Sequence, residues 1–274
     1  MIPTSTIAAC IFTLFVSLIL PVLVLILFAV KHRKQGILSA WLLGAAGFVV
    51  TQILIRLPIL TFLQNQDWFA SFAQRHLFLY AFSLAFTAGL FELAGRFAAA
   101  KLMRRNLTYR RSLAAGLGHG GIEATLLIGM TYVNNLTYIF MINSGAFDTL
   151  MAQTAAAGMD VSQLHFIQDA LLHTSPAMFL LAGFERLLTM IVHVAMSMLV
   201  CYGIAHGQTG ICVLLCLGIH TLIDLSAGIS LVLPQSTAYP IIEAILTVMA
   251  VLSLFVIREI FHRWKKEVSH DLEK

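Results

Sequence analysis

The chain has 274 residues, of which 59% are hydrophobic and only 11% are charged, and its formal net charge is +4. This composition leaves too little polar surface for a water-soluble domain of that length, so it excludes the soluble classes and indicates a membrane protein. The apolar runs are about 20 residues or longer, as in spanning helices, whereas barrel strands are shorter and alternate. The sequence therefore predicts an all-α, polytopic membrane helix bundle.

About seven spans are predicted within a single integral-membrane domain that covers residues 1–274. Their expected ranges are 7–30, 37–63, 76–100, 113–133, 177–205, 210–233 and 240–261. The one long connection, 134–176, contains three aspartates and no lysine or arginine. Within it, Val161–His173 has the apolar spacing of an interfacial helix. We expect this connection to be an extracytoplasmic loop.

The basic residues indicate an orientation. They follow the first, third and seventh spans, in Lys31–Lys34, Lys101–Arg111 and the charged tail His262–Lys274. The connections after the second, fourth and sixth spans contain Arg75 as their only basic residue. Because basic loops stay in the cytoplasm, this pattern predicts an N-terminus outside and a C-terminus in the cytoplasm. The same rule, together with anionic lipid, explains the basic loops without any nucleic-acid partner.

Several ionisable side chains fall inside the predicted spans. They are Glu92, His119, Glu123, His193, His220 and Asp224. With a rise of 1.5 Å per residue, they lie about 9 to 21 Å from the cytoplasmic ends of four different helices. Single polar residues in spans can serve only as interhelical hydrogen-bond partners, worth about 0.6 kcal/mol each. Six groups at a shared depth instead favour a polar functional chamber, because buried charges are costly in a membrane.

Three pairs of ionisable residues in these spans are four residues apart, so each pair lies on one helix face. They are Glu92 with Arg96, His119 with Glu123, and His220 with Asp224. Glycines surround His119, at Gly116, Gly118, Gly120 and Gly121. They would allow close approach of a neighbouring helix or of a substrate backbone.

Two chemistries suit these residues, and the sequence leaves both open. Glu92 or Glu123 could act as a general base on water, with imidazole partners and no cofactor. Alternatively His193, His220 and Glu123 could hold a zinc ion that leaves one position open for water. Neither the His-Glu-x-x-His motif of zinc proteases nor the Gly-x-Ser-x-Gly motif of serine hydrolases is present.

The order of the motifs resembles the YhfC family of predicted intramembrane peptidases, which is related to PrsW and to the CAAX-processing and bacteriocin-processing proteases. Those relatives carry a Glu-Glu-x-x-Arg/Lys type motif, then Phe-x-x-x-Glu/His, then His-x-x-x-Asp/Asn. The corresponding segments here are Phe91–Arg96, His119–Glu123 and His220–Asp224. The second glutamate of the first motif is Leu93 in this chain, and the second motif opens with His119. The resemblance implies that Glu92 is the base.

These observations lead to the hypothesis of an intramembrane peptidase that hydrolyses a peptide bond of a membrane-associated protein or peptide, in the plasma membrane of a bacterium. The catalytic candidates are Glu92, Glu123, His193 and His220. The supporting candidates are Arg96, His119 and Asp224. Asp224 would orient His220, and Arg96 would pair with a carboxylate or bind a substrate terminus. The alternative is a non-enzymatic transporter or scaffold in which the same groups form an ion or proton path.

Overall fold

The computed structural model describes residues 1–272, with side chains up to Lys266; Glu273 and Lys274, the end of the predicted charged tail, lie outside the described residues. Within the described range every regular element is helical, and seven helical segments are long and apolar enough to cross a membrane. They are Thr4–Lys31, Ile37–Gln64, Leu77–Asn106, Tyr109–Ser144, Pro176–Ala205, Thr209–Leu231 and Gln235–Lys266. The all-α class and the expected number of spans are thus confirmed.

The fourth of these segments is longer than the expected span over 113–133. Helix α7 (Tyr109–Glu123) continues through a π-helical stretch, Ala124–Gly129, into α8 (Met130–Ser144). Apolar residues resume after the polar Asn134 and Asn135, and the helix ends where Gly145 adopts a positive φ of 79°. The remaining connection folds as α9 (Ala146–Ala156) and α10 (Ser162–His173), the second of which covers the stretch with the interfacial pattern.

The chain forms two compact units whose boundaries fall inside helices. The first unit comprises Met1–Val22 and Ala124–Leu187. In this unit α1 (Thr4–Leu14) packs along α8, and the hydroxyl of Thr13 donates a hydrogen bond to the carbonyl oxygen of Phe179 at 2.6 Å. That bond satisfies a fully buried hydroxyl, which would otherwise be costly in an apolar interior.

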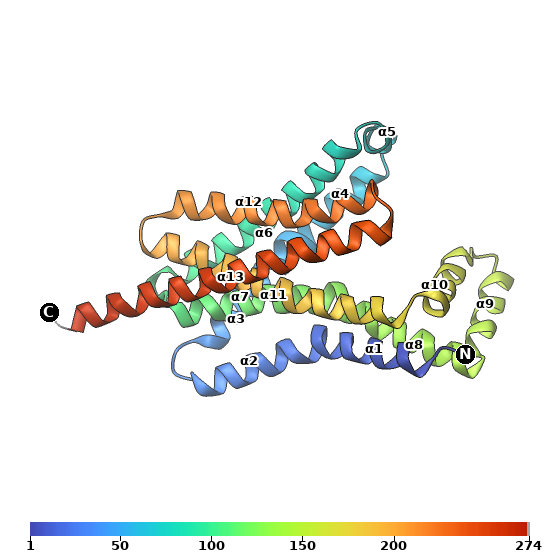
Figure 1. Cartoon of the computed structure of the whole chain (residues 1–274), viewed down its shortest axis with the longest axis horizontal. Coiled ribbons are helices and arrows are strands. Elements are labelled where there is room, and N and C mark those ends of the chain that lie inside the picture. The colour runs from blue at the N-terminus through green and yellow to red at the C-terminus, as the bar shows by residue number, and fades with distance from the viewer. Residues whose placement is uncertain (273–274) are drawn as a thin grey trace. The chain divides into compact units, whose positions relative to one another are not determined.

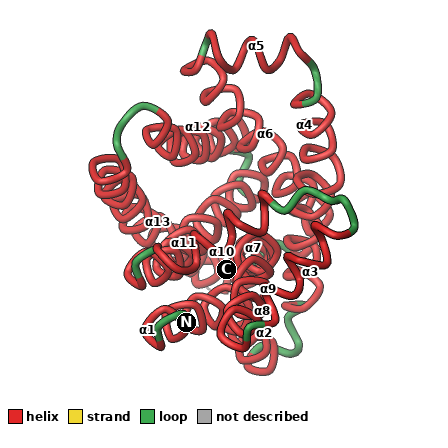
Figure 2. Tube along the Cα trace, turned by 90° about the vertical axis from the view of Figure 1, so that its right-hand side faces the viewer, coloured by secondary structure: helices red, strands yellow, loops and turns green. Residues whose placement is uncertain are grey.

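The second unit comprises Leu23–Glu123 and Leu188–Lys274 and contains all the predicted site residues. Its helices are the end of α2 (Leu20–Lys31), α3 (Ile37–Phe48), α4 (Leu57–Gln64), α5 (Asp67–Arg75), α6 (Leu77–Met103), α7, most of α11 (Pro176–Ala205), α12 (Thr209–Ala227) and α13 (Gln235–Leu272). Helix α6 lies beside α12 on one side and α3 on another, and α3 lies against α7 (Figures 1 and 2).

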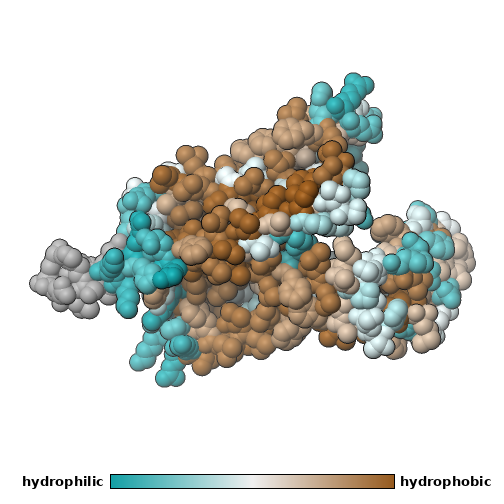
Figure 3. Space-filling model, viewed as in Figure 1, coloured by the Kyte–Doolittle hydropathy of each residue, from teal (hydrophilic) through white to brown (hydrophobic). Residues whose placement is uncertain are grey.

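The exposed surface of the second unit is largely apolar along its long helices. Leu214 and Leu222 on α12 and Val251 and Phe255 on α13 are about half exposed or more. Figure 3 shows hydrophobic residues over these helices, whereas hydrophilic residues gather at α5 and toward the end of α13. A continuous apolar surface of this kind is expected where helices face lipid.

Glycines bring the backbones of the second unit into direct contact. A Cβ placed on Gly118 of α7 would lie 2.0 Å from the carbonyl oxygen of Trp41 on α3. Gly47 on α3 and Gly95 on α6 face each other, so a Cβ on either would lie 2.8 or 2.5 Å from the other's carbonyl oxygen. Such small-residue contacts are typical of helix packing in membranes. They hold α6 and α7 on either side of α3.

Candidate active site

Glu92 of α6 lies at the centre of a buried polar cluster. The residue is only 4% exposed, and its Oε2 lies 3.1 Å from His119 Nε2 and 3.1 Å from Arg96 Nη2. The same oxygen lies 3.7 Å from His193 Nδ1 and 3.6 Å from His220 Nδ1. Side chains from α6, α7, α11 and α12 therefore converge on one carboxylate oxygen.

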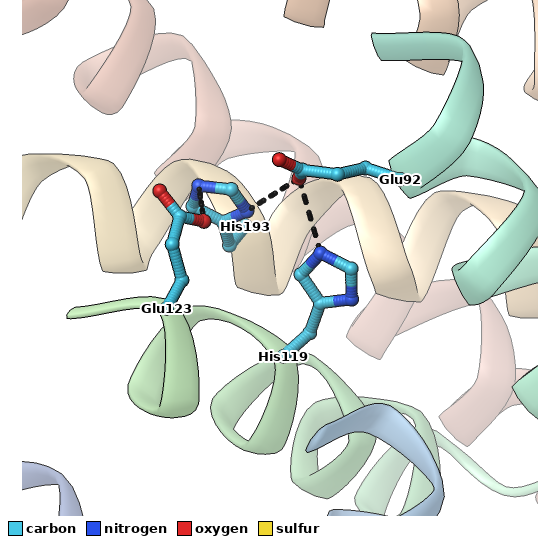
Figure 4. A group of neighbouring side chains, drawn as sticks. All are labelled: Glu92, His119, Glu123 and His193. Atoms are coloured by element: carbon cyan, nitrogen blue, oxygen red, sulfur yellow. Dashed lines mark hydrogen bonds and ion pairs between the residues drawn. The ribbon is translucent and has the colours of Figure 1, made fainter. Parts of the chain in front are cut away.

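His193 connects this carboxylate to a second one. Its Nε2 lies 2.9 Å from Glu123 Oε2 (Figure 4), and Nη2 of Arg96 contacts its Nδ1. Because a guanidinium only donates hydrogen bonds, Nδ1 of His193 is the acceptor. The proton of the neutral ring is then on Nε2, the nitrogen that lies 2.9 Å from Glu123 Oε2. Glu123, His193, Arg96 and Glu92 thus form a continuous chain of polar contacts.

Close helix packing places the two α7 side chains in this cluster. A Cβ on Gly116 would lie 2.6 Å from the Cα of Val194, and one on Gly120 would lie 2.8 Å from the Cβ of His193. These contacts let α7 approach α11 closely enough for Glu123 to reach His193. His119, one residue before Gly120, is fully buried and has Phe48 of α3 edge-on to its ring, with centroids 5.4 Å apart.

Four residues of the cluster could share a metal ion. Glu92, His119, Glu123 and His193 each offer one ligand atom, and these four atoms all lie within 4.8 Å of one another (Figure 4). Compared with the predicted metal set, this group contains His119 and Glu92 in addition to His193 and Glu123, and it does not contain His220. The second ring nitrogen of His220 instead lies 3.2 Å from Asp224 Oδ2.

The donor types fit a divalent transition metal. Imidazole nitrogens and carboxylate oxygens at about 2.0 Å from a tetrahedral zinc ion would be roughly 3.3 Å apart. The distances of 3.1 Å between His119 and Glu92, and 2.9 Å between His193 and Glu123, are close to that spacing. One contact opposes metal binding between Glu92 and His193, because the Arg96 guanidinium lies between these two side chains. An ion bound by the facing atoms of those two residues would require Arg96 to turn aside.

Gln52 is part of the cluster, although it was not among the residues predicted from the sequence. Gln52 is 5% exposed, and its Nε2 donates a hydrogen bond to Glu92 Oε1 at 2.8 Å. It lies in a π-helical stretch, Val49–Arg56, that continues α3. The signal available in the sequence was an amide inside an apolar span, four residues before Arg56. An uncharged amide is a weaker indication of function than the histidines and carboxylates, because ionisable side chains are the costly ones inside a membrane.

The fold and the cluster together define a class: a multi-pass membrane protein with a buried centre of carboxylates and imidazoles able to hold a metal ion. The sequence model of the family described as YhfC intramembrane metalloprotease matches residues 11–256. The chain therefore belongs to this family, and the resemblance found in its motifs is confirmed.

One relative is similar over nearly its whole length. The chain is 28% identical to the membrane protein YhfC of Bacillus subtilis (strain 168) over 250 residues, which cover 90% of this chain and 94% of that protein. No solved structure matches the chain. The family and this relative agree with a multi-pass membrane protein.

Proposed function

We propose that the protein is a metal-dependent intramembrane peptidase that hydrolyses a peptide bond of a membrane-associated protein or peptide. The observation that carries the proposal is the buried group of Glu92, His119, Glu123 and His193 in a chain of the intramembrane metalloprotease family. Two imidazoles and a carboxylate are a common ligand set of catalytic zinc, so zinc is the proposed ion.

His119, His193 and Glu123 would hold the ion, which leaves Glu92 for proton transfer. When bound, zinc would polarise the scissile carbonyl and lower the pKa of water at the site. Glu92 would accept a proton from the attacking water and later give it to the leaving amine. Its position supports this role, because its Oε2 is the atom on which the cluster converges.

Arg96 and His220 have supporting roles in this proposal. The Nε and Nη1 atoms of Arg96 are buried and have no hydrogen-bond partner among the described residues. They could stabilise the negative oxygen that develops in the transition state or bind a substrate carboxylate. His220, on α12, would orient Glu92. The contact of His220 with Asp224 would fix the direction of the His220 ring.

We also propose that the chain acts as one integral-membrane domain with its N-terminus outside and its C-terminus in the cytoplasm. The lysines and arginines of the connections support the orientation. Continuous helices support the single domain, because the boundaries between the two compact units fall within α2, within α11 and where α7 passes into the π-helical stretch Ala124–Gly129, rather than in flexible linkers.

The experiment uses the purified protein in proteoliposomes that contain single-span membrane peptides. Cleavage is followed by mass spectrometry and bound metal by elemental analysis. We expect one metal ion per chain and cleavage that a chelator abolishes. Glu92→Gln should abolish cleavage and keep the metal, whereas Glu123→Gln and His193→Ala should lose both. Glu259→Gln is the matched control, because it makes the same chemical change at an exposed ion pair on α13.

Several outcomes would reject the proposal. Cleavage that persists in all three cluster variants would exclude these residues as the active site. Cleavage that resists chelation in a protein without bound metal would reject the metal and leave the glutamate mechanism. Ion-dependent uptake into the vesicles without any cleavage would favour the transporter.

A further inference from the structure

The side-chain amide of Gln52 uses both of its ends inside the second unit. Its Nε2 lies 2.8 Å from Glu92 Oε1 and 3.2 Å from the carbonyl oxygen of Ala88, while its Oε1 accepts a hydrogen bond from Arg56 Nη1 at 3.3 Å. An arginine can only donate, so this contact fixes which end of the amide is the oxygen. The NH2 group therefore faces Glu92.

Arg56 is itself anchored to the backbone of α6. Its Nη2 donates to the carbonyl oxygen of Leu84 at 2.7 Å, and its Nε lies 3.4 Å from the hydroxyl of Thr87. The amide of Gln52 is therefore held between the guanidinium of Arg56, which is hydrogen-bonded to α6, and the carboxylate of Glu92, which belongs to α6. Its π-helical setting, Val49–Arg56, is a feature that often occurs at functional sites.

The two oxygens of Glu92 consequently have different partners. Gln52 donates to Oε1, whereas Arg96 donates to Oε2 and the three histidines face that oxygen. Rotation of a glutamate carboxylate about its last side-chain bond has only broad preferences, so the direction of its oxygens is set by their partners. Among the described residues, the hydrogen bonds of Gln52 within the cluster go to Glu92 alone.

We propose that Gln52 is a positioning residue that fixes the rotation of the Glu92 carboxylate, so that Oε2 faces the histidines. Arg56 supports it by holding the amide oxygen. The catalytic meaning of this role depends on the proposed peptidase function, but the orientation of the carboxylate can be tested without any activity.

The test compares Gln52→Met with Thr51→Val and Glu92→Gln. Gln52→Met keeps the length of the side chain and removes both polar ends. Thr51→Val is the matched control, because Thr51 is the adjacent residue in the same π-helical stretch and its hydroxyl donates a hydrogen bond to the carbonyl oxygen of Gly47 rather than to the cluster. Infrared spectra of the metal-free protein are recorded first, and the Glu92 band is identified as the carboxylate band that Glu92→Gln removes.

We expect the Glu92 carboxylate band to shift in Gln52→Met and to stay in place in Thr51→Val. Cleavage should show kcat lowered about 10- to 100-fold in Gln52→Met with KM nearly unchanged, as is typical when a supporting partner of a catalytic group is lost. A Glu92 band that does not move would overturn the inference, even if cleavage occurs. A band that moves while kcat keeps its wild-type value would also overturn it, since the orientation would then not matter for catalysis. A wild-type protein that cleaves nothing would reject the peptidase function and leave the infrared result to decide the orientation.

Discussion

The substitution Gly118→Ala tests whether contact between α3 and α7 backbones sets the geometry of the cluster. The added Cβ would lie 2.0 Å from the carbonyl oxygen of Trp41, a backbone atom that cannot rotate away. Ordinary contact begins at 3.4 Å, so the two helices must separate locally by about 1.4 Å, which is the difference between 3.4 and 2.0 Å. His119 is the next residue on α7, and Glu123 is one turn further.

The expected effects follow from this displacement. Overpacking of a well-packed interior typically costs 1 to 3 kcal/mol, so the unfolding temperature in detergent should fall. A misplacement of about 1 Å at a catalytic group can lower the rate by about 10²-fold, so kcat should fall. The fall should exceed what the loss of folded protein would explain. Metal affinity should also decrease, because His119 and Glu123 both belong to the candidate ligand group.

Gly218→Ala is the matched control. None of the described residues lies within 4 Å of a Cβ placed on Gly218, which is in the middle of α12. The same chemical change should therefore leave cleavage intact and stabilise the helix by up to about 1 kcal/mol. The reasoning would be refuted if Gly118→Ala matched Gly218→Ala in unfolding temperature, metal affinity and kcat.

Three further predictions concern the partners of the cluster, the ion and the orientation. Asp224→Asn should lower kcat several-fold with unchanged metal content, because it removes the charge that faces His220 Nε2 at 3.2 Å; wild-type kinetics would exclude an orienting role. Removal of metal by a chelator should lower the unfolding temperature, and zinc at 100 times its Kd should restore about 2.7 kcal/mol of stability; a temperature that zinc does not change would contradict a folded-state ion. A green fluorescent protein fused to the C-terminus should fluoresce and an alkaline phosphatase fused there should be inactive, since only the first folds in the cytoplasm; the opposite pattern would reverse the proposed orientation.

The fold class and the number of spans were predictable because they depend on the chain's own composition. Apolar runs of about 20 residues must form helices in lipid, whatever their neighbours are. The pairs of polar residues at a spacing of four were predictable for a similar reason, because an α-helix puts both on one face. His119 and Glu123 illustrate this, since both reach the group that could hold an ion.

Which side chains of different helices meet was harder to predict from the sequence. Whether His119 or His220 joins the candidate metal group depends on how each helix is rotated, and that rotation is set by backbone contacts such as Gly118 with Trp41. Gln52 depends on a further local feature, the π-helical stretch that begins at Val49, which changes the direction of the side chains that follow it. Neither the rotation of a helix nor the position of a π-helical stretch can be predicted from hydropathy.

The charges of the cluster give a physical reason to expect a bound cation. Glu92 and Glu123 place two carboxylates in the cluster, Arg96 forms an ion pair with Glu92, and all three residues are at most 9% exposed. Burying ions costs several kcal/mol each in desolvation, so a cation that the carboxylates can bind directly would lower the free energy of the buried cluster. A divalent cation would act on both carboxylates at once, because Glu92 and Glu123 both belong to the group that could hold an ion. Because zinc also prefers the ligand types present, its binding would stabilise the same arrangement that the proposed reaction needs.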